Sequence, residues 1–167
     1  MFNSGYPYKY LRNEKDYCYN TTIRVYIYSF KSTKTNKDYI VRIEDLDKNA
    51  FALKYFLKES AKNKNRYKIL TKLNEPFQVF RTCIDIMIDF LKNNKKASFI
   101  VVGEASTNEE KTNTQRYRIY EYMFKNFFSV IHFEHYNLVK HSIYVLLNRE
   151  NKESLQHIEN LIQNFIK

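Results

Sequence analysis

Basic and aromatic residues alternate along the amino-terminal part of this chain, and that pairing suits contact with nucleic acid. The candidate contacts are Arg24, Tyr26, Tyr28, Arg42, Lys54, Phe56, Lys58, Lys64 and Arg66. Cationic side chains neutralise phosphates, and flat rings stack on bases, at about 1–3 kcal/mol per base. We therefore predict a platform for RNA or single-stranded DNA if these residues share one open sheet face. The alternatives are that helices cover this face, or that tyrosine is present because it favours strands.

The charge distribution also favours an anionic partner. The net charge is +10, and residues 1–72 hold 16 of the 28 Lys and Arg but only 7 of the 18 Asp and Glu. Such asymmetry is typical of a face for polyanions. An AT-rich genome would also produce many lysines, although it explains their clustering less readily.

A second candidate site follows an apolar segment that ends at Gly103. There a polar loop leads to a predicted helix, and backbone N–H groups at a helix N-terminus can hold an anion. The candidate contacts are Gly103, Lys111, Arg116 and Arg118. The glycine-rich pattern of a phosphate loop is missing. Residues two apart on a helix point in different directions, so we expect at least one of Arg116 and Arg118 to be solvated or ion-paired.

Two other groups contain residue types that bind metals or transfer protons. They are His132, Glu134, His135 and His141, and the carboxylates Glu44, Asp45 and Asp47. On a strand, His132 and Glu134 would face one side and His135 the other, so the first group does not converge. We predict ordinary packed or surface histidines and a solvated turn, with no catalytic residue, metal or cofactor. The two cysteines, Cys18 and Cys83, are expected to be free thiols.

Hydrophobic periodicity predicts the elements that position these residues. Strands at residues 22–30, 38–44 and 50–58 alternate in polarity, and a shorter one at 66–71 completes an antiparallel meander. The predicted inward residues are Ile23, Val25, Ile27, Tyr39, Val41, Ile43, Phe51, Leu53, Tyr55 and Leu57. The meander would present its opposite face to a partner.

For the rest of the chain, the sequence predicts helices and strands in the order α-β-α-β-β-α. Its parts are a helix at 76–92 with Pro76 in the first turn, an apolar strand at 97–103, a helix at 114–127, a hairpin at 130–135 and 142–147, and a helix at 151–167. We therefore predict an α+β or α/β fold in one domain, residues 1–167, with helices flanking a mixed central sheet.

The location follows from what the sequence lacks. No apolar run approaches the ~20 residues of a membrane-spanning helix. Residues 1–10 show no basic segment followed by an apolar one, so no secretion signal is predicted. The expected location is the cytoplasm, without membrane contact.

Residues 77–148 resemble a family of small α/β proteins found chiefly in Bacteroidetes. The likeness rests on Ser98-Phe99 with Gly103, on the run Thr114-Gln115-Arg116-Tyr117-Arg118-Ile119-Tyr120, and on Phe133-Glu134-His135 ahead of the strand with Tyr144. The resemblance implies an α/β fold and no catalytic residue.

The element order is also similar to the core of the N-acetyltransferases. That family binds acetyl-coenzyme A through a Gln/Arg-x-x-Gly-x-Gly/Ala turn that opens a helix. Here the corresponding place reads Leu73-Asn74-Glu75-Pro76-Phe77-Gln78, without the glycines. The resemblance therefore implies at most a degenerate acetyltransferase-like enzyme.

Three functional hypotheses remain open. The first is a non-enzymatic protein that binds RNA or single-stranded DNA. The second is a protein-interaction module, for example an inhibitor from a phage or mobile element that engages a partner's acidic groove, because Arg-rich and aromatic surfaces suit both uses. The third is the acetyltransferase-like enzyme. A homodimer through a Tyr-rich edge strand is also possible on sequence grounds.

Overall fold

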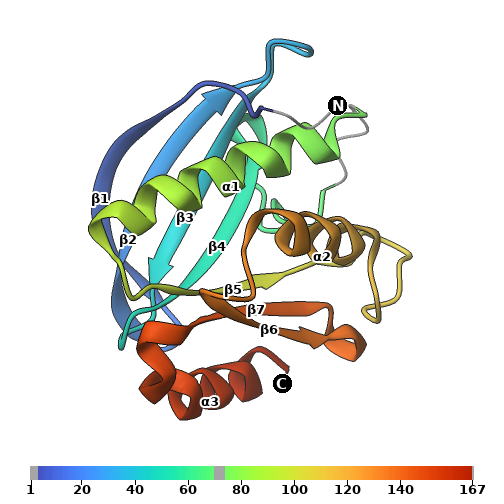
Figure 1. Cartoon of the computed structure of the whole chain (residues 1–167). Helices are drawn as coiled ribbons and strands as arrows, with labels where there is room; N and C mark the ends of the chain where they lie inside the picture. Colours follow the sequence, from blue (N-terminus) through green and yellow to red (C-terminus); the bar gives the residue numbers. More distant parts are fainter. Residues whose placement is uncertain (1–3, 70–73, 167) are drawn as a thin grey trace.

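A seven-stranded mixed sheet forms the centre of the molecule (Figure 1). The computed structural model describes residues 4–69 and 74–166. In chain order the strands are β1 (Tyr8–Cys18), β2 (Thr21–Lys31), β3 (Asp38–Asp45), β4 (Ala50–Leu57), β5 (Ser98–Val102), β6 (Phe133–Leu138) and β7 (Ile143–Asn148). In space their order is β1-β2-β3-β4-β5-β7-β6, and only the pair β4–β5 is parallel.

In the described part of the chain, three helices pack on this sheet. They are α1 (Pro76–Asn93), α2 (Gln115–Phe127) and α3 (Leu155–Ile166), with 3-10 turns η1 (Lys58–Ser60), η2 (Val139–His141) and η3 (Arg149–Ser154). Pro76 suits the start of α1 because its missing N–H would have no helical acceptor there. The Thr114 hydroxyl caps α2 by accepting the Tyr117 N–H at 3.1 Å. No helix in the described part of the chain is long and apolar enough to cross a membrane.

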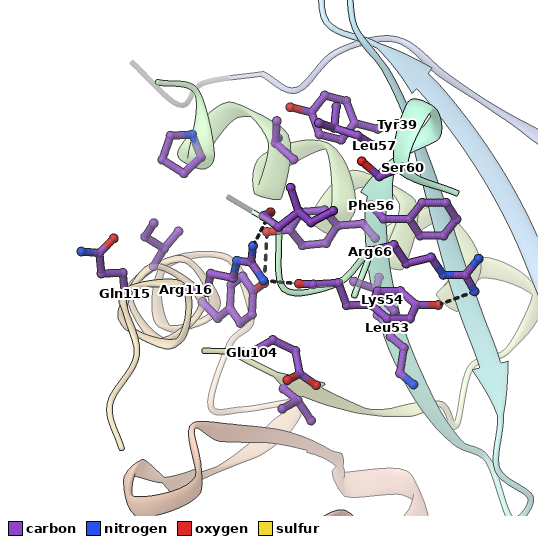
Figure 2. A pocket seen from close by; sticks show the side chains of 18 of the residues that line it. Tyr39, Leu53, Lys54, Phe56, Leu57, Ser60, Arg66, Glu104, Gln115 and Arg116 are labelled. Carbon is purple, nitrogen blue, oxygen red and sulfur yellow. Dashed lines mark hydrogen bonds between the residues drawn. The ribbon is translucent and has the colours of Figure 1, made fainter. Parts of the chain in front are cut away.

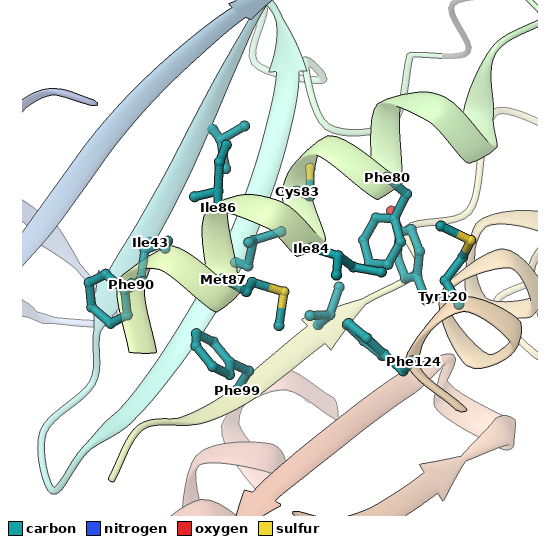
Figure 3. Packing of buried hydrophobic residues seen from close by; sticks show 14 of the residues in the cluster. Ile43, Phe80, Cys83, Ile84, Ile86, Met87, Phe90, Phe99, Tyr120 and Phe124 are labelled. Atoms are coloured by element: carbon teal, nitrogen blue, oxygen red, sulfur yellow. The ribbon is translucent and has the colours of Figure 1, made fainter. Parts of the chain in front are cut away.

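The larger core lies between the sheet and helices α1 and α2, and it is strongly aromatic (Figure 3). The Phe80 ring stacks on Tyr120 with centroids 4.2 Å apart and meets Phe124 edge-on at 5.2 Å. Cys83 is buried as a free thiol beside them. Burial of a large apolar side chain contributes about 1.5–3 kcal/mol, so this layer fixes both helices on the sheet.

A second core covers the opposite face under α3. Ile158 and Ile162 pack there with Ile143 and Val145 of β7 and with Ile100 of β5. The middle strands are thus buried on both faces. This explains the almost continuously apolar run that predicted a central strand at 97–103.

The predicted fold class is confirmed by the mixed sheet, its antiparallel meander and its flanking helices. The strand predicted at 66–71 is wrong for residues 66–69: residues 66–68 form turns and residue 69 has no regular structure. Residues 70 and 71 lie outside the described part. The edge strand β1 was not predicted, because its sequence is mostly polar and exposed and it is held by its pairing with β2.

The predicted inward residues of β2, Ile23, Val25 and Ile27, are buried, but the prediction that they share a sheet face with the inward residues of β3 and β4 is wrong. The register pairs Val25 with Glu44 and Ile27 with Arg42, so the valine and isoleucines of β2 face α3. The inward residues of β3, such as Val41, belong to the core under α1 instead. Each set of alternate residues in β2 includes several apolar or aromatic side chains, so alternation shows the period but not which face of the sheet each set occupies.

Candidate functional site

The predicted nucleic-acid platform is divided between the two faces of the sheet, which corrects the sequence-based arrangement. Arg24, Tyr26 and Tyr28 lie on the α1 side. The Tyr28 ring is only 7% exposed, and the Tyr26 ring packs edge-on against Phe90 at 5.2 Å. Arg24 is exposed and donates to the Asn13 amide oxygen at 3.2 Å. The two tyrosines therefore serve the core rather than an open stacking surface.

Arg42 and Lys54 lie on the other face, where carboxylates of the protein pair with them. Arg42 is 6% exposed and contacts Glu44 at 3.1 Å and Asp16 at 2.8 Å. Lys54 lies 3.3 Å from Glu44, and the rings of Tyr19 and Tyr67 flank its ammonium group. Glu44 is 1% exposed, so the solvated turn predicted around it is wrong for this residue.

Phe56 and Arg66 contact each other instead of lying open. The Arg66 guanidinium lies 4.4 Å from the centroid of the Phe56 ring and also bonds to the Tyr67 hydroxyl at 3.2 Å. Phe56 is 6% exposed and offers no free face to a base.

The remaining predicted cations, Lys58 and Lys64, belong to a surface that we call the basic end, made of residues 31–38 and 58–69. These residues include eight Lys and Arg against two Asp and Glu. A Lys37–Glu59 ion pair of 2.9 Å joins the two segments. Four of its lysines are exposed and form neither an ion pair nor a side-chain hydrogen bond with any residue that the structure describes: Lys58, Lys62, Lys64 and Lys68. Lys34 is also exposed without an ion pair, but it donates to the Asn74 carbonyl at 3.0 Å.

A cavity of about 350 Å³ lies beneath the basic end (Figure 2). The parallel ladder between β4 and β5 ends at the pair Ala52 and Ile100, but β4 continues to Leu57, so the two strands separate. Apolar and aromatic walls come from Tyr39, Leu53, Tyr55, Leu57, Val79, Ile119 and Tyr120, and polar groups from Lys54, Ser60, Arg66, Glu104, Gln115 and Arg116. Apolar walls with a few polar groups are typical of ligand sites.

Hydrogen bonds from Arg116 of α2 link this helix to the basic end beside the cavity. Its guanidinium donates to the carbonyl of Tyr67 and, at 2.7 Å, to that of Ile69 (Figure 2). The Arg116 guanidinium, which was predicted to bind an anion, therefore binds two backbone carbonyls instead.

The second predicted anion site is not assembled. Gly103 packs against the start of α2, Lys111 is exposed, and the Arg118 guanidinium bonds to the Asn113 carbonyl at 2.6 Å. The protein's own Glu109 carboxylate accepts the Gln115 N–H at 2.9 Å at the N-terminus of α2. Burial alone would raise the Glu109 pKa, but this donation and those from Ser106 lower it.

The histidine group does not converge either. His135 lies between the Tyr144 hydroxyl at 2.6 Å and the Phe128 carbonyl at 2.9 Å. Since a carbonyl only accepts, Nε2 carries the proton and Nδ1 accepts from Tyr144. Burial lowers the His135 pKa. Within the described residues, no three His, Cys, Asp or Glu side chains are placed to hold a metal ion.

Sequence reasoning missed Glu75, a carboxylate buried at the start of α1. It is 5% exposed and accepts four hydroxyl hydrogen bonds, from Tyr6 at 2.7 Å, Ser32 at 2.6 Å, Thr35 at 3.1 Å and Tyr39 at 3.0 Å. Burial raises its pKa, and the hydroxyl donations outweigh that effect, so the pKa of Glu75 is lowered. The only sequence signal was a glutamate directly before the helix-starting proline.

Glu75 also bears on the acetyltransferase resemblance. The residues at the start of α1 do not fit a pyrophosphate, because the buried Glu75 carboxylate would repel it and Pro76 has no N–H to donate. We therefore assign no coenzyme A chemistry to this helix.

The likenesses noted in the sequence remain predictions. A search of family models, of curated proteins and of solved structures yielded no match to this chain.

Proposed function

We propose that the basic end binds the phosphates of single-stranded nucleic acid, either RNA or DNA, without catalysis. The observation that carries this proposal is the group Lys58, Lys62, Lys64 and Lys68, which is exposed and without carboxylate partners among the described residues. When such lysines neutralise phosphates, the counterions condensed on the nucleic acid are released, and this release drives non-specific binding. The structure thus supports a different location from the sheet face that the sequence predicted.

The proposal is tested by charge reversal at Lys62 and Lys64. Binding of a labelled 12-nucleotide strand is followed by fluorescence anisotropy across a salt series. We expect Lys62→Glu with Lys64→Glu to weaken binding about 10- to 100-fold at low salt and to reduce the slope of log affinity against log salt by about 1.4, or about 0.7 per phosphate contact.

Lys95 and Lys96 provide the matched control. They are also exposed and lie three and two residues before the start of β5, whereas the cavity adjoins the end of that strand. Lys95→Glu with Lys96→Glu makes the same change in net charge and should change affinity by less than about threefold. Equal losses from both pairs, or no binding by the wild type at low salt, would contradict the proposal.

A protein partner with an acidic groove remains the second candidate, because the same unpaired lysines would suit it. Affinity purification with and without nuclease separates the two. Material that is lost on nuclease treatment indicates nucleic acid, whereas a partner that survives nuclease but not the Lys62 and Lys64 reversals indicates protein.

A further inference from the structure

The cavity contains a strand edge with unused hydrogen-bonding groups. The Asn49 carbonyl accepts the Ser98 N–H at 2.8 Å, and main-chain groups alternate in direction along a strand, so the odd-numbered residues of β4 direct theirs toward β5. The last β4–β5 pair is Ala52 with Ile100, so by this alternation the N–H and C=O of Tyr55 and the N–H of Leu57 point away from β3 beyond the end of the ladder, at residues that line the cavity. Main-chain groups away from bulk water need hydrogen-bond partners, so these groups are positioned to bond to a polar ligand.

Side chains add further donors and acceptors at the same place. The Tyr120 hydroxyl donates to the Tyr55 hydroxyl at 3.0 Å. This bond uses one of the two hydroxyl protons, so the Tyr55 hydroxyl can still donate to a ligand. The Glu104 carboxylate lines the cavity and has no ion pair or hydrogen bond with any residue in the described ranges (Figure 2). A ligand here would therefore be flat, largely apolar on its faces, and rich in donors and acceptors at its edge.

A phosphate does not meet that description, because Glu104 would repel it, but a nucleobase does. Resting on the proposed function, we infer that one base of the bound strand turns out of the stack into the cavity, where its edge bonds to β4 and Glu104. The phosphates on either side of this nucleotide stay at the basic end. Arg66 and Tyr67 belong to the basic end and also line the cavity, so the two sites adjoin. Removing a base from a single strand has a modest free-energy cost.

Glu104 also indicates which bases fit. A carboxylate only accepts hydrogen bonds, so it favours a base edge rich in N–H groups. Guanine presents two neighbouring N–H donors on its Watson–Crick edge, whereas thymine and uracil have no amino group. The cavity should therefore prefer guanine to thymine.

The test compares a 12-nucleotide thymidine strand with the same strand carrying one central guanine or one central abasic site. We expect the guanine strand to bind the wild type about 5- to 10-fold more tightly than the other two. Glu104→Gln should remove this preference. It should not weaken the all-thymidine strand, since losing a negative charge favours any polyanion.

Glu110→Gln is the matched control, because Glu110 is an exposed carboxylate on the same loop that does not line the cavity. It should keep the guanine preference. Independently, the amide NMR signals of Tyr55 and Leu57 should shift with the guanine strand but not with the abasic one.

The outcomes separate the two proposals. If no strand binds at low salt, the proposed function fails, and this inference fails with it. If all strands bind equally in a manner sensitive to Lys62 and Lys64, and the two amide signals do not move, only the base-binding inference is overturned.

Discussion

Glu75→Ala should lower the free energy of unfolding by about 3–5 kcal/mol. The carboxylate joins α1 to three other parts of the chain, because its hydroxyl donors are Tyr6 near the amino terminus, Ser32 and Thr35 in the β2–β3 turn, and Tyr39 in β3. A hydrogen bond to a charged group contributes about 1.5–3 kcal/mol, and Glu75→Ala removes four such bonds at once. Urea denaturation measures the loss.

The pH dependence provides a second measurement for the same residue. The folded pKa of Glu75 lies below its ordinary value of 4.5. Its ionised form therefore stabilises the fold above the unfolded pKa, and that stability is lost as pH falls through the folded pKa. Glu75→Gln, which keeps the shape, should remove this part of the acid sensitivity and cost about 2–3 kcal/mol near pH 7.

Glu59→Gln is the control for both measurements. Glu59 is an exposed carboxylate whose ion pair with Lys37 lies at the surface, so its loss should cost less than about 1 kcal/mol. A Glu75 variant that is no less stable than the Glu59 variant would show that the hydroxyl cluster does not hold α1 to the turn.

The fold could be predicted from the sequence in segments where a single hydrophobic periodicity dominated. Helix α1 was anticipated at residues 76–92, and the structure has Pro76–Asn93, because its polar stripe is distinct and Pro76 marks its start. β1 could not be predicted, because an edge strand held mainly by main-chain bonds has no apolar pattern of its own. β2 showed its period but not its orientation, because both of its faces are covered.

The candidate site was less predictable because it depends on strand register. Nothing in the local sequence around Arg42 shows that Asp16, 26 residues earlier, pairs with its guanidinium. The basic end had a visible signal, since residues 58–69 alone include five Lys and Arg. The cavity had none, because it depends on where β4 and β5 separate and on side chains from α1 and α2.

Gly103 gives the second large effect, for a reason that differs from the predicted anion site. A Cβ atom at this position would lie 2.6 Å from the Tyr117 nitrogen and 2.8 Å from its Cα, which are backbone atoms that side-chain rotation cannot move. The Thr114 hydroxyl also donates to the Gly103 carbonyl at 2.6 Å, so β5 and α2 meet here directly. We expect Gly103→Ala to destabilise the fold by about 2–3 kcal/mol, because α2 must shift off the sheet.

Thr114→Ala separates this steric effect from the loss of the helix cap. On its own it should cost about 1 kcal/mol, since it removes the hydroxyl that caps α2. It should not rescue Gly103→Ala, because the closest atom to the new Cβ belongs to the Tyr117 backbone rather than to Thr114. Denaturation of both single variants and of the double variant checks this. A double variant more stable than Gly103→Ala alone would mean that the Thr114 side chain, and not the helix backbone, requires glycine at the end of β5.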